Sequence, residues 1–210
     1  MLIKFYLLLF FFNIGFVCNN ELQKKTEKSM LTENKVEKAI FGGGCFWCTE
    51  AIFEDLKGVV EVNAGYAGGK TMNPTYKEVC SGNTGHAEVV EIIYNPGIVS
   101  YEFLLSVFFK THDPTSVNKQ GNDRGTQYRS VIYYTTEQQK SAASSVISAL
   151  NAEKVYDKPI VTEVSSLTNF YLAEEYHQDY YKKNPEEGYC QYVVQPKIEK
   201  FKKVFKPYLK

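Results

Sequence analysis

Strand-like and helix-like segments alternate along most of the chain, and this alternation restricts the possible folds more than any other feature. Apolar runs bounded by glycine or proline predict strands, and they cover residues 37–41, 59–69, 86–96, 128–135 and 158–164. Apolar residues at helical spacing predict helices over residues 46–56, 101–112, 137–154 and 170–184. Alternation of this kind predicts a sheet with helices packed on it.

The first 36 residues differ in composition from the rest of the chain. Lys4 gives residues 1–18 a positive charge near their start, and residues 5–17 form an almost unbroken apolar run with the length of a signal-peptide core. Cys18 follows that run, as the lipid-modified cysteine does in bacterial lipoproteins, although the three residues before it depart from the usual small-residue pattern. An uncleaved membrane anchor is the alternative.

The division of the chain follows from these patterns. We predict a signal peptide or lipoprotein signal over 1–18, a polar, lysine-rich linker over 19–36 and a single domain over 37–210. The protein is therefore expected to be exported, either periplasmic or membrane-anchored. Acidic and basic residues balance at 24 each, which argues against a general nucleic-acid binder.

The stretch "GGGCFWCTE" at residues 42–50 holds the strongest candidate for a reactive group. Cys45 follows a glycine turn and starts a predicted helix, so unpaired N–H groups and the helix dipole are expected to lower its thiol pKa. A thiolate is the nucleophile that cysteine chemistry needs. Phe46 and Trp47 either hold an apolar group beside the sulfur or pack in the core.

Cys48 lies one helical turn after Cys45, a spacing that permits a redox disulfide or half of a zinc site. Zinc needs a second pair of ligands, and the remaining cysteines and histidines have no paired spacing. We therefore expect no metal.

Glu88 stands at the head of an apolar strand, between Ala87 and Val89. Apolar surroundings would raise the pKa of its carboxyl, so that it could carry a proton at neutral pH and act as a general acid. The alternative is an exposed glutamate at a strand end.

Several stretches together resemble the A-type peptide methionine sulfoxide reductases. They run in order from about residue 40 to 182, and the C-terminal "GYCQYVVQPKIEKF" adds a further similarity. The matching stretches are "GGGCFWCTE", "GYAGG", "NPTYKEVCSGNTGHAEVV", "HDPT", "GNDRGTQYRS" and "YHQDYY". Each is several residues long and none is a common motif, so the resemblance is specific.

The resemblance implies a role for each matching side chain. Cys45 would be the nucleophile and Glu88 the acid that protonates the sulfoxide oxygen. The substrate-binding residues would be Phe46 and Trp47 for the methyl group, Tyr76 and Tyr128 as donors to the oxygen, and Asp123 to position the pocket. His177 would give support, whereas His86 and His112 have no role that we can argue.

The resemblance also implies the activity and the fold. The expected enzyme reduces methionine S-sulfoxide, free or in proteins, through a sulfenic acid and a disulfide, and so repairs oxidative damage. It needs no cofactor beyond an external dithiol reductant such as thioredoxin, and we expect a monomer. The expected fold is α+β: a mixed sheet with packed helices in a two-layer, ferredoxin-like sandwich.

The sequence leaves two candidates for the resolving thiol, the one that condenses with the sulfenic acid. Cys190 is favoured because it follows Pro185 and Gly188 in a tail without a strong helix pattern before about Lys197, and Cys48 is the alternative. Cys80 is expected to be a small buried residue.

Two other functions compete with the reductase. A general thiol–disulfide oxidoreductase would use Cys45 and Cys48 but gives Glu88 and the tyrosines no task. An exported, non-enzymatic domain with structural disulfides leaves the glycine-rich motif without a purpose.

Overall fold

The structure is a computed structural model that describes residues 36–210. The predicted signal segment, Cys18 and all but the last residue of the predicted linker lie outside the described residues.

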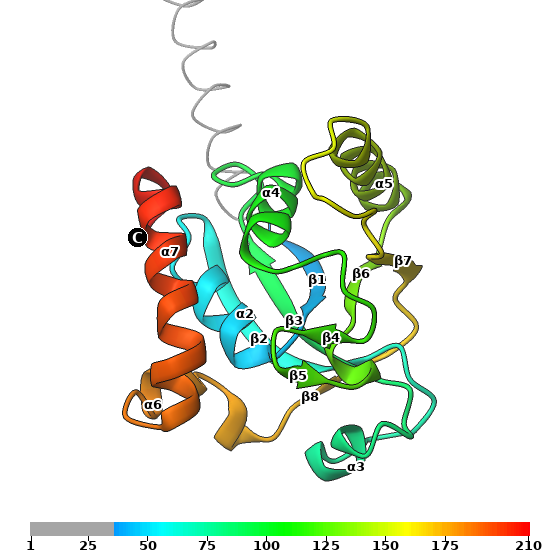
Figure 1. Ribbon diagram of the computed structural model, residues 1–210, viewed down its shortest axis with the longest axis vertical. Helices are drawn as coiled ribbons and strands as arrows, with labels where there is room; N and C mark the ends of the chain where they lie inside the picture. Colours follow the sequence, from blue (N-terminus) through cyan, green and yellow to red (C-terminus); the bar gives the residue numbers. More distant parts are fainter. Residues whose placement is uncertain (1–35) are drawn as a thin grey trace, which may run out of the picture. The chain divides into compact units, whose positions relative to one another are not determined.

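A curled mixed sheet forms the centre of the described domain (Figure 1). Its six strands lie in the order β7-β6-β1-β3-β2-β8, and β6 with β7 is the parallel pair, while the other neighbours are antiparallel. The strands are β1 (Glu37–Gly43), β2 (Val59–Ala67), β3 (Ala87–Tyr94), β6 (Ser130–Tyr134), β7 (Glu163–Ser166) and β8 (Phe170–Leu172). A separate two-stranded hairpin joins β4 (Lys119–Gln120) to β5 (Asp123–Arg124).

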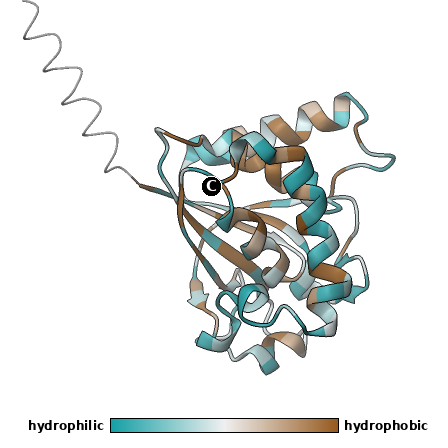
Figure 2. Cartoon of the chain, turned by 90° about the vertical axis from the view of Figure 1, so that its left-hand side faces the viewer, coloured by the Kyte–Doolittle hydropathy of each residue, from teal (hydrophilic) through white to brown (hydrophobic). Residues whose placement is uncertain are grey.

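Helices cover one face of this sheet. The longer ones are α2 (Phe46–Glu54), α4 (Tyr101–Thr111), α5 (Glu137–Ala152) and α7 (Gln195–Phe205), and the short ones are α3 (Tyr76–Cys80) and α6 (Tyr180–Lys183). Apolar residues alternate along the strands, so Phe41 and Ile92 enter the large core under the helices, whereas Ile40 and Val89 enter a smaller core on the other face. Figure 2 shows hydrophobic colour on the strands and mixed colours along the helices that cover them.

The connections explain the two-layer form. α2 joins β1 to β2, and β3 lies between those strands; α4 joins β3 to β6, and β1 lies between them. Two interleaved β-α-β units of this kind are the ferredoxin-like arrangement. The predicted α+β, two-layer, ferredoxin-like fold is confirmed.

The helix predicted over residues 170–184 is wrong. The segment instead forms β8, a 3₁₀ turn (Glu175–His177) and α6. Phe170 packs against Gly65 of β2, where a Cβ would come within 2.5 Å of its ring, so the chain adds an edge strand there. The Gln178 side chain then bonds both backbone groups of Ala64, and Asp179 adopts a left-handed conformation with φ 54°.

Two further boundaries differ from the sequence-based expectation. The strand predicted over 158–164 begins only at Glu163, because the Val161 N–H donates to the Pro114 carbonyl instead of pairing with a strand. The C-terminal helix begins before Lys197, since a π-helical turn (Cys190–Val194) leads directly into α7.

Candidate active site

The turn between β1 and α2 presents Cys45 at the start of a helix. Gly44 makes that turn with φ 95°, and a Cβ there would lie 2.5 Å from the Gln120 side chain. Cys45 is the N-cap of α2: its carbonyl accepts from the N–H groups of Cys48 and Thr49 at 3.2 and 3.4 Å. The predicted position of this thiol at a helix start is confirmed.

The predicted lowering of the Cys45 thiol pKa is wrong. Burial raises that pKa well above its ordinary value, and the hydrogen bond with Cys48 and the charge of Glu88 add to the effect. Only 6 % of Cys45 is exposed. The first N–H of the helix, that of Phe46, donates to Glu88 Oε2 at 3.1 Å, so this helix-start donor serves the carboxyl group. Cys45 therefore rests as a thiol.

Glu88 lies on β3 beside this turn and is 1 % exposed. Burial raises the pKa of its carboxyl to about 8; the Phe46 N–H opposes the shift, and the charges of Asp123 and Cys48 add to it. The carboxyl is thus mostly protonated at neutral pH. Of the two alternatives that the sequence left open for Glu88, the structure has the buried carboxyl with the raised pKa and not the exposed one.

Aromatic rings form a wall around the nucleophile. Phe46 is buried, and its ring stacks with that of Tyr76 at 6.3 Å between centroids. Trp47 stacks on Tyr180 at 3.7 Å and donates its Nε1–H to His177 Nδ1 at 3.1 Å. This bond leaves the neutral His177 ring with its proton on Nε2, and it fixes the orientation of the Trp47 ring.

Tyr76 and Tyr128 come from two different short helical segments, and both lie within range of the Glu88 charge. A capping box at Thr75 starts α3 and so orients Tyr76, whose N–H also donates to Glu174 Oε1 at 2.9 Å. Tyr128 ends a 3₁₀ turn (Thr126–Tyr128). Burial first, and the charge of Glu88 second, raise the pKa of both phenols, so both stay neutral hydrogen-bond donors.

Asp123 lies on the β4–β5 hairpin, where it accepts a hydrogen bond from the Tyr189 hydroxyl at 2.7 Å. Sequence reasoning gave Tyr189 no role. Its ring meets Trp47 edge-on at 5.7 Å, and its hydroxyl is also in hydrogen-bond contact with Cys45. The signal that could have found it is the C-terminal "GYCQY", in which Tyr189 directly precedes Cys190.

Glu174 is a second residue that the sequence gave no reason to select. It accepts from the Tyr66 hydroxyl at 2.8 Å and from the Tyr76 N–H, and so ties the segment after β8 to α3. No motif in the sequence marks this carboxylate.

The four described cysteines are all free thiols. Cys48 is buried and hydrogen-bonded to Cys45, and Cys190 is completely buried in the π-helical turn. The expectation that Cys80 is buried is wrong: Val79 takes the inward position of the short helix α3, so Cys80 is exposed.

Residues 36–210 hold neither a metal-binding cluster nor a helix that could span a membrane. No three histidine, cysteine or acidic side chains gather there in a way that could hold a metal ion. None of the helices in this range has the length and apolar character needed to cross a membrane.

Comparison with known proteins shows which family has this sequence. The sequence model described as "Peptide methionine sulfoxide reductase" matches residues 37–208. The chain belongs to the peptide methionine sulfoxide reductase family. A peptide methionine sulfoxide reductase MsrA of Chromobacterium violaceum is 54 % identical over 170 residues, which are 81 % of this chain and 97 % of that protein. One from Deinococcus radiodurans is 52 % identical, over 80 % of this chain and 82 % of the relative.

Solved structures of similar proteins agree with this membership. Reduced Mxr1 from Saccharomyces cerevisiae is 35 % identical with a TM-score of 0.70, over 74 % of this chain and 90 % of that one. Methionine sulfoxide reductase A of Corynebacterium diphtheriae is 38 % identical with a TM-score of 0.67, over 76 % and 79 %. The reductase family therefore accounts for the fold as well as for the sequence motifs.

Proposed function

We propose that this chain reduces methionine S-sulfoxide, free or in proteins, with Cys45 as nucleophile and Glu88 as general acid. One observation carries the proposal: the Phe46 N–H that begins the helix of Cys45 is bonded to the buried Glu88, and burial raises the pKa of that carboxyl to about 8. This brings a nucleophile and a proton donor to one point. General thiol–disulfide exchange has no need of a buried carboxylic acid at that point.

The chemistry follows from the groups around Cys45. A sulfoxide sulfur is electrophilic, but its oxygen leaves poorly until it is protonated. Cys45 attacks the sulfur while Glu88 protonates the oxygen. Overall, the Cys45 thiol and the sulfoxide are converted to a sulfenic acid on Cys45 and the thioether side chain of methionine. Glu88 recovers its proton from the thiol or from solvent.

The remaining site residues are proposed to bind the substrate. The aromatic faces of Phe46 and Trp47 suit the methyl group, and the neutral hydroxyls of Tyr76 and Tyr128 suit the oxygen. Asp123 positions the pocket through Tyr189.

A second thiol, Cys190 or Cys48, then condenses with the sulfenic acid, and an external dithiol reductant of the thioredoxin type restores the enzyme. Mxr1 from Saccharomyces cerevisiae, which has the same fold as this chain, has been solved in complex with Trx2. No organic cofactor enters the cycle.

Turnover of the two sulfoxide epimers with dithiothreitol tests the proposal. We expect reduction of the S epimer alone, and none in Cys45→Ser because no thiol remains to attack sulfur. A tenth of the parent activity in Cys45→Ser would remove Cys45 from its role.

The proposed location rests on the sequence alone. Export through residues 1–18 predicts a mature N-terminus at or near Cys18, with or without lipid. Intact-mass measurement of protein from the native host tests this, and Met1 on a cytoplasmic protein would contradict it.

A further inference from the structure

The ammonium group of Lys197 reaches across from the C-terminal helix to a buried cysteine. Its Nζ donates to Cys48 Sγ at 3.7 Å. Lys197 lies in the first turn of α7, next to Ile198 on the face that packs into the core, and is itself half-buried. α2 and α7 are in contact, so the pair joins two helices that are far apart in sequence.

The groups around Cys48 favour a negative charge on this sulfur rather than on its neighbour. Cys45 shares a hydrogen bond with Cys48, and that bond lowers the Cys48 pKa and raises the Cys45 pKa. Burial opposes the lowering, and the ammonium of Lys197 reinforces it. The other charged groups that act on Cys48 are Asp123, which raises its pKa, and Glu88.

Cys190 lacks such support. Burial raises the pKa of its thiol, and the nearby charges of Cys48 and Glu187 raise it further. The side chain is completely enclosed in the turn before α7. It therefore rests as a thiol, whereas attack on a sulfenic acid needs a thiolate.

We propose that Lys197 is a positioning residue that holds Cys48 as a thiolate, so that Cys48, before Cys190, attacks the sulfenic acid on Cys45. The inference rests on the proposed function, because it concerns the step after methionine has left. Cys48 Sγ forms a bond to Cys45 Sγ, and the S–O bond of the sulfenic acid breaks. The Cys48 sulfur is oxidised, the Cys45 sulfur is reduced, and the oxygen leaves as water with one proton from solvent.

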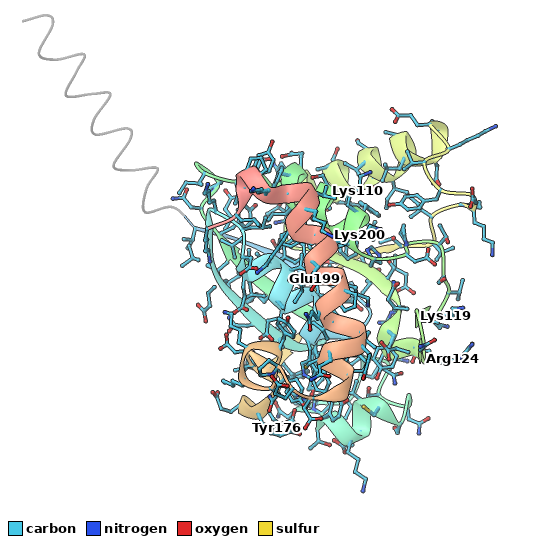
Figure 3. The ribbon with its side chains drawn as sticks, turned by 60° about the vertical axis from the view of Figure 1, so that its left-hand side comes forward. Lys110, Lys119, Arg124, Tyr176, Glu199 and Lys200 are labelled. Atoms are coloured by element: carbon cyan, nitrogen blue, oxygen red, sulfur yellow. The ribbon has the colours of Figure 1, made fainter. Side chains whose placement is uncertain are left out.

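A basic cavity beside this contact supplies a matched control. The cavity has a volume of about 450 Å³, and Lys110, Lys197 and Lys200 contribute to its lining. Lys110 and Lys200 lie near one another in Figure 3. Lys200 is on the same helix as Lys197 and lines the same cavity, yet its ammonium has no hydrogen bond to Cys48 among those found in the described residues.

The test compares Lys197→Met, Lys197→Arg and Lys200→Met in the reduced enzyme. The first measurement is the alkylation rate of Cys48 by iodoacetamide against pH, followed by peptide mapping. An opposite charge at this distance shifts a pKa by about 1–3 units, so we expect the Cys48 midpoint to rise by that amount in Lys197→Met. Lys197→Arg keeps the charge and should restore most of the shift, and Lys200→Met should leave the midpoint unchanged.

The second measurement is a single turnover with methionine S-sulfoxide. Methionine release reports the proposed function, and the lifetime of dimedone-trappable sulfenic acid reports this inference. In Lys197→Met a smaller fraction of Cys48 is thiolate, although each thiolate is more nucleophilic because its pKa is higher. We therefore expect the Cys45–Cys48 disulfide to form about threefold to fiftyfold more slowly. Absence of methionine release in the parent enzyme would refute the proposed function.

Release of methionine with an unchanged Cys48 midpoint in Lys197→Met would overturn the role of Lys197. A first disulfide that maps to Cys45 and Cys190 would overturn the order of attack. A higher midpoint together with a longer-lived sulfenic acid, both restored by arginine, would establish the inference.

Discussion

Replacing Glu88 with glutamine should remove activity and at the same time stabilise the protein at neutral pH. Glutamine has the shape of the protonated side chain, and its carbonyl can accept the Phe46 N–H. It cannot deliver a proton, so we expect the first-turnover rate to fall about 10²–10⁴-fold, the usual contribution of a positioned general acid.

The change in stability follows from the pKa. The Glu88 carboxyl has a pKa of about 8 in the folded chain against the ordinary 4.5, so the folded state binds more protons between these two values. Its contribution to the free energy of unfolding is therefore full below pH 4.5 and is lost as pH rises to about 8. Between pH 5 and pH 8 the loss amounts to about 3–4 kcal/mol, at 1.36 kcal/mol for each pKa unit.

Glutamine does not titrate, so Glu88→Gln escapes this loss. Relative to the parent, its free energy of unfolding should rise by about 3–4 kcal/mol between pH 5 and pH 8. This corresponds to a Tm difference of roughly 6–16 °C for a chain of this size. Because the comparison is between two pH values, any pH-independent cost of the amide cancels.

Urea denaturation of both proteins at pH 5, 6, 7 and 8 measures the effect. Glu91→Gln is the control, since Glu91 is on the same strand but is ion-paired with Lys38 at the surface. Glu91→Gln should change the free energy of unfolding by less than about 1 kcal/mol at every pH. A stability difference between Glu88→Gln and the parent that is the same at pH 5 and pH 8 would show that burial does not hold the proton, and the acid assignment would lose its physical basis.

Three other substitutions test separate parts of the site and the fold. Tyr189→Phe removes the hydroxyl beside the nucleophile and should slow methionine release in the first turnover about tenfold or more, because a bond to a charged group is lost; an unchanged rate would mean that the hydroxyl has no part in the reaction. Gly65→Ala forces a Cβ against Phe170 and should lower the free energy of unfolding by about 1–3 kcal/mol, whereas Gly188→Ala, with open space around it, should not. Cys190→Ser should still form one intramolecular disulfide after a single turnover, and mapping that finds none would make Cys190 the resolving thiol.

Much of the fold could be read from local patterns. Strands β1 and β3 and helices α4 and α5 lie within two residues of their predicted bounds, because alternating burial and capping residues such as Ser100 and Thr136 mark them. Segment 170–184 failed because its aromatic residues are spaced as in a helix, while the bonds that shape it reach Ala64 on a distant strand.

The chemistry of the site divides in the same way. The burial of Glu88 could be anticipated from its apolar neighbours, since these continue along one strand. The raised pKa of the Cys45 thiol could not, because the sequence does not show that this sulfur is buried or that Cys48 and Glu88 lie close to it. Local sequence predicts which groups can react, whereas long-range contacts decide where the charge rests.

The antiparallel pairing of β1 with β3 has a consequence for protein engineering. Phe41 pairs with Val90, so the turn to Cys45 and the side chain of Glu88 are aligned by strand register alone. Because successive residues of a strand face opposite sides, inserting or deleting one residue in β3 would send Glu88 to the opposite face, and the same change in β1 would shift the turn to Cys45 relative to Glu88. New termini or inserted domains are therefore expected to be tolerated in exposed loops, such as the turn at residues 153–157 after α5, whereas changing the length of the paired segments 39–43 and 88–92 is expected to abolish the reaction.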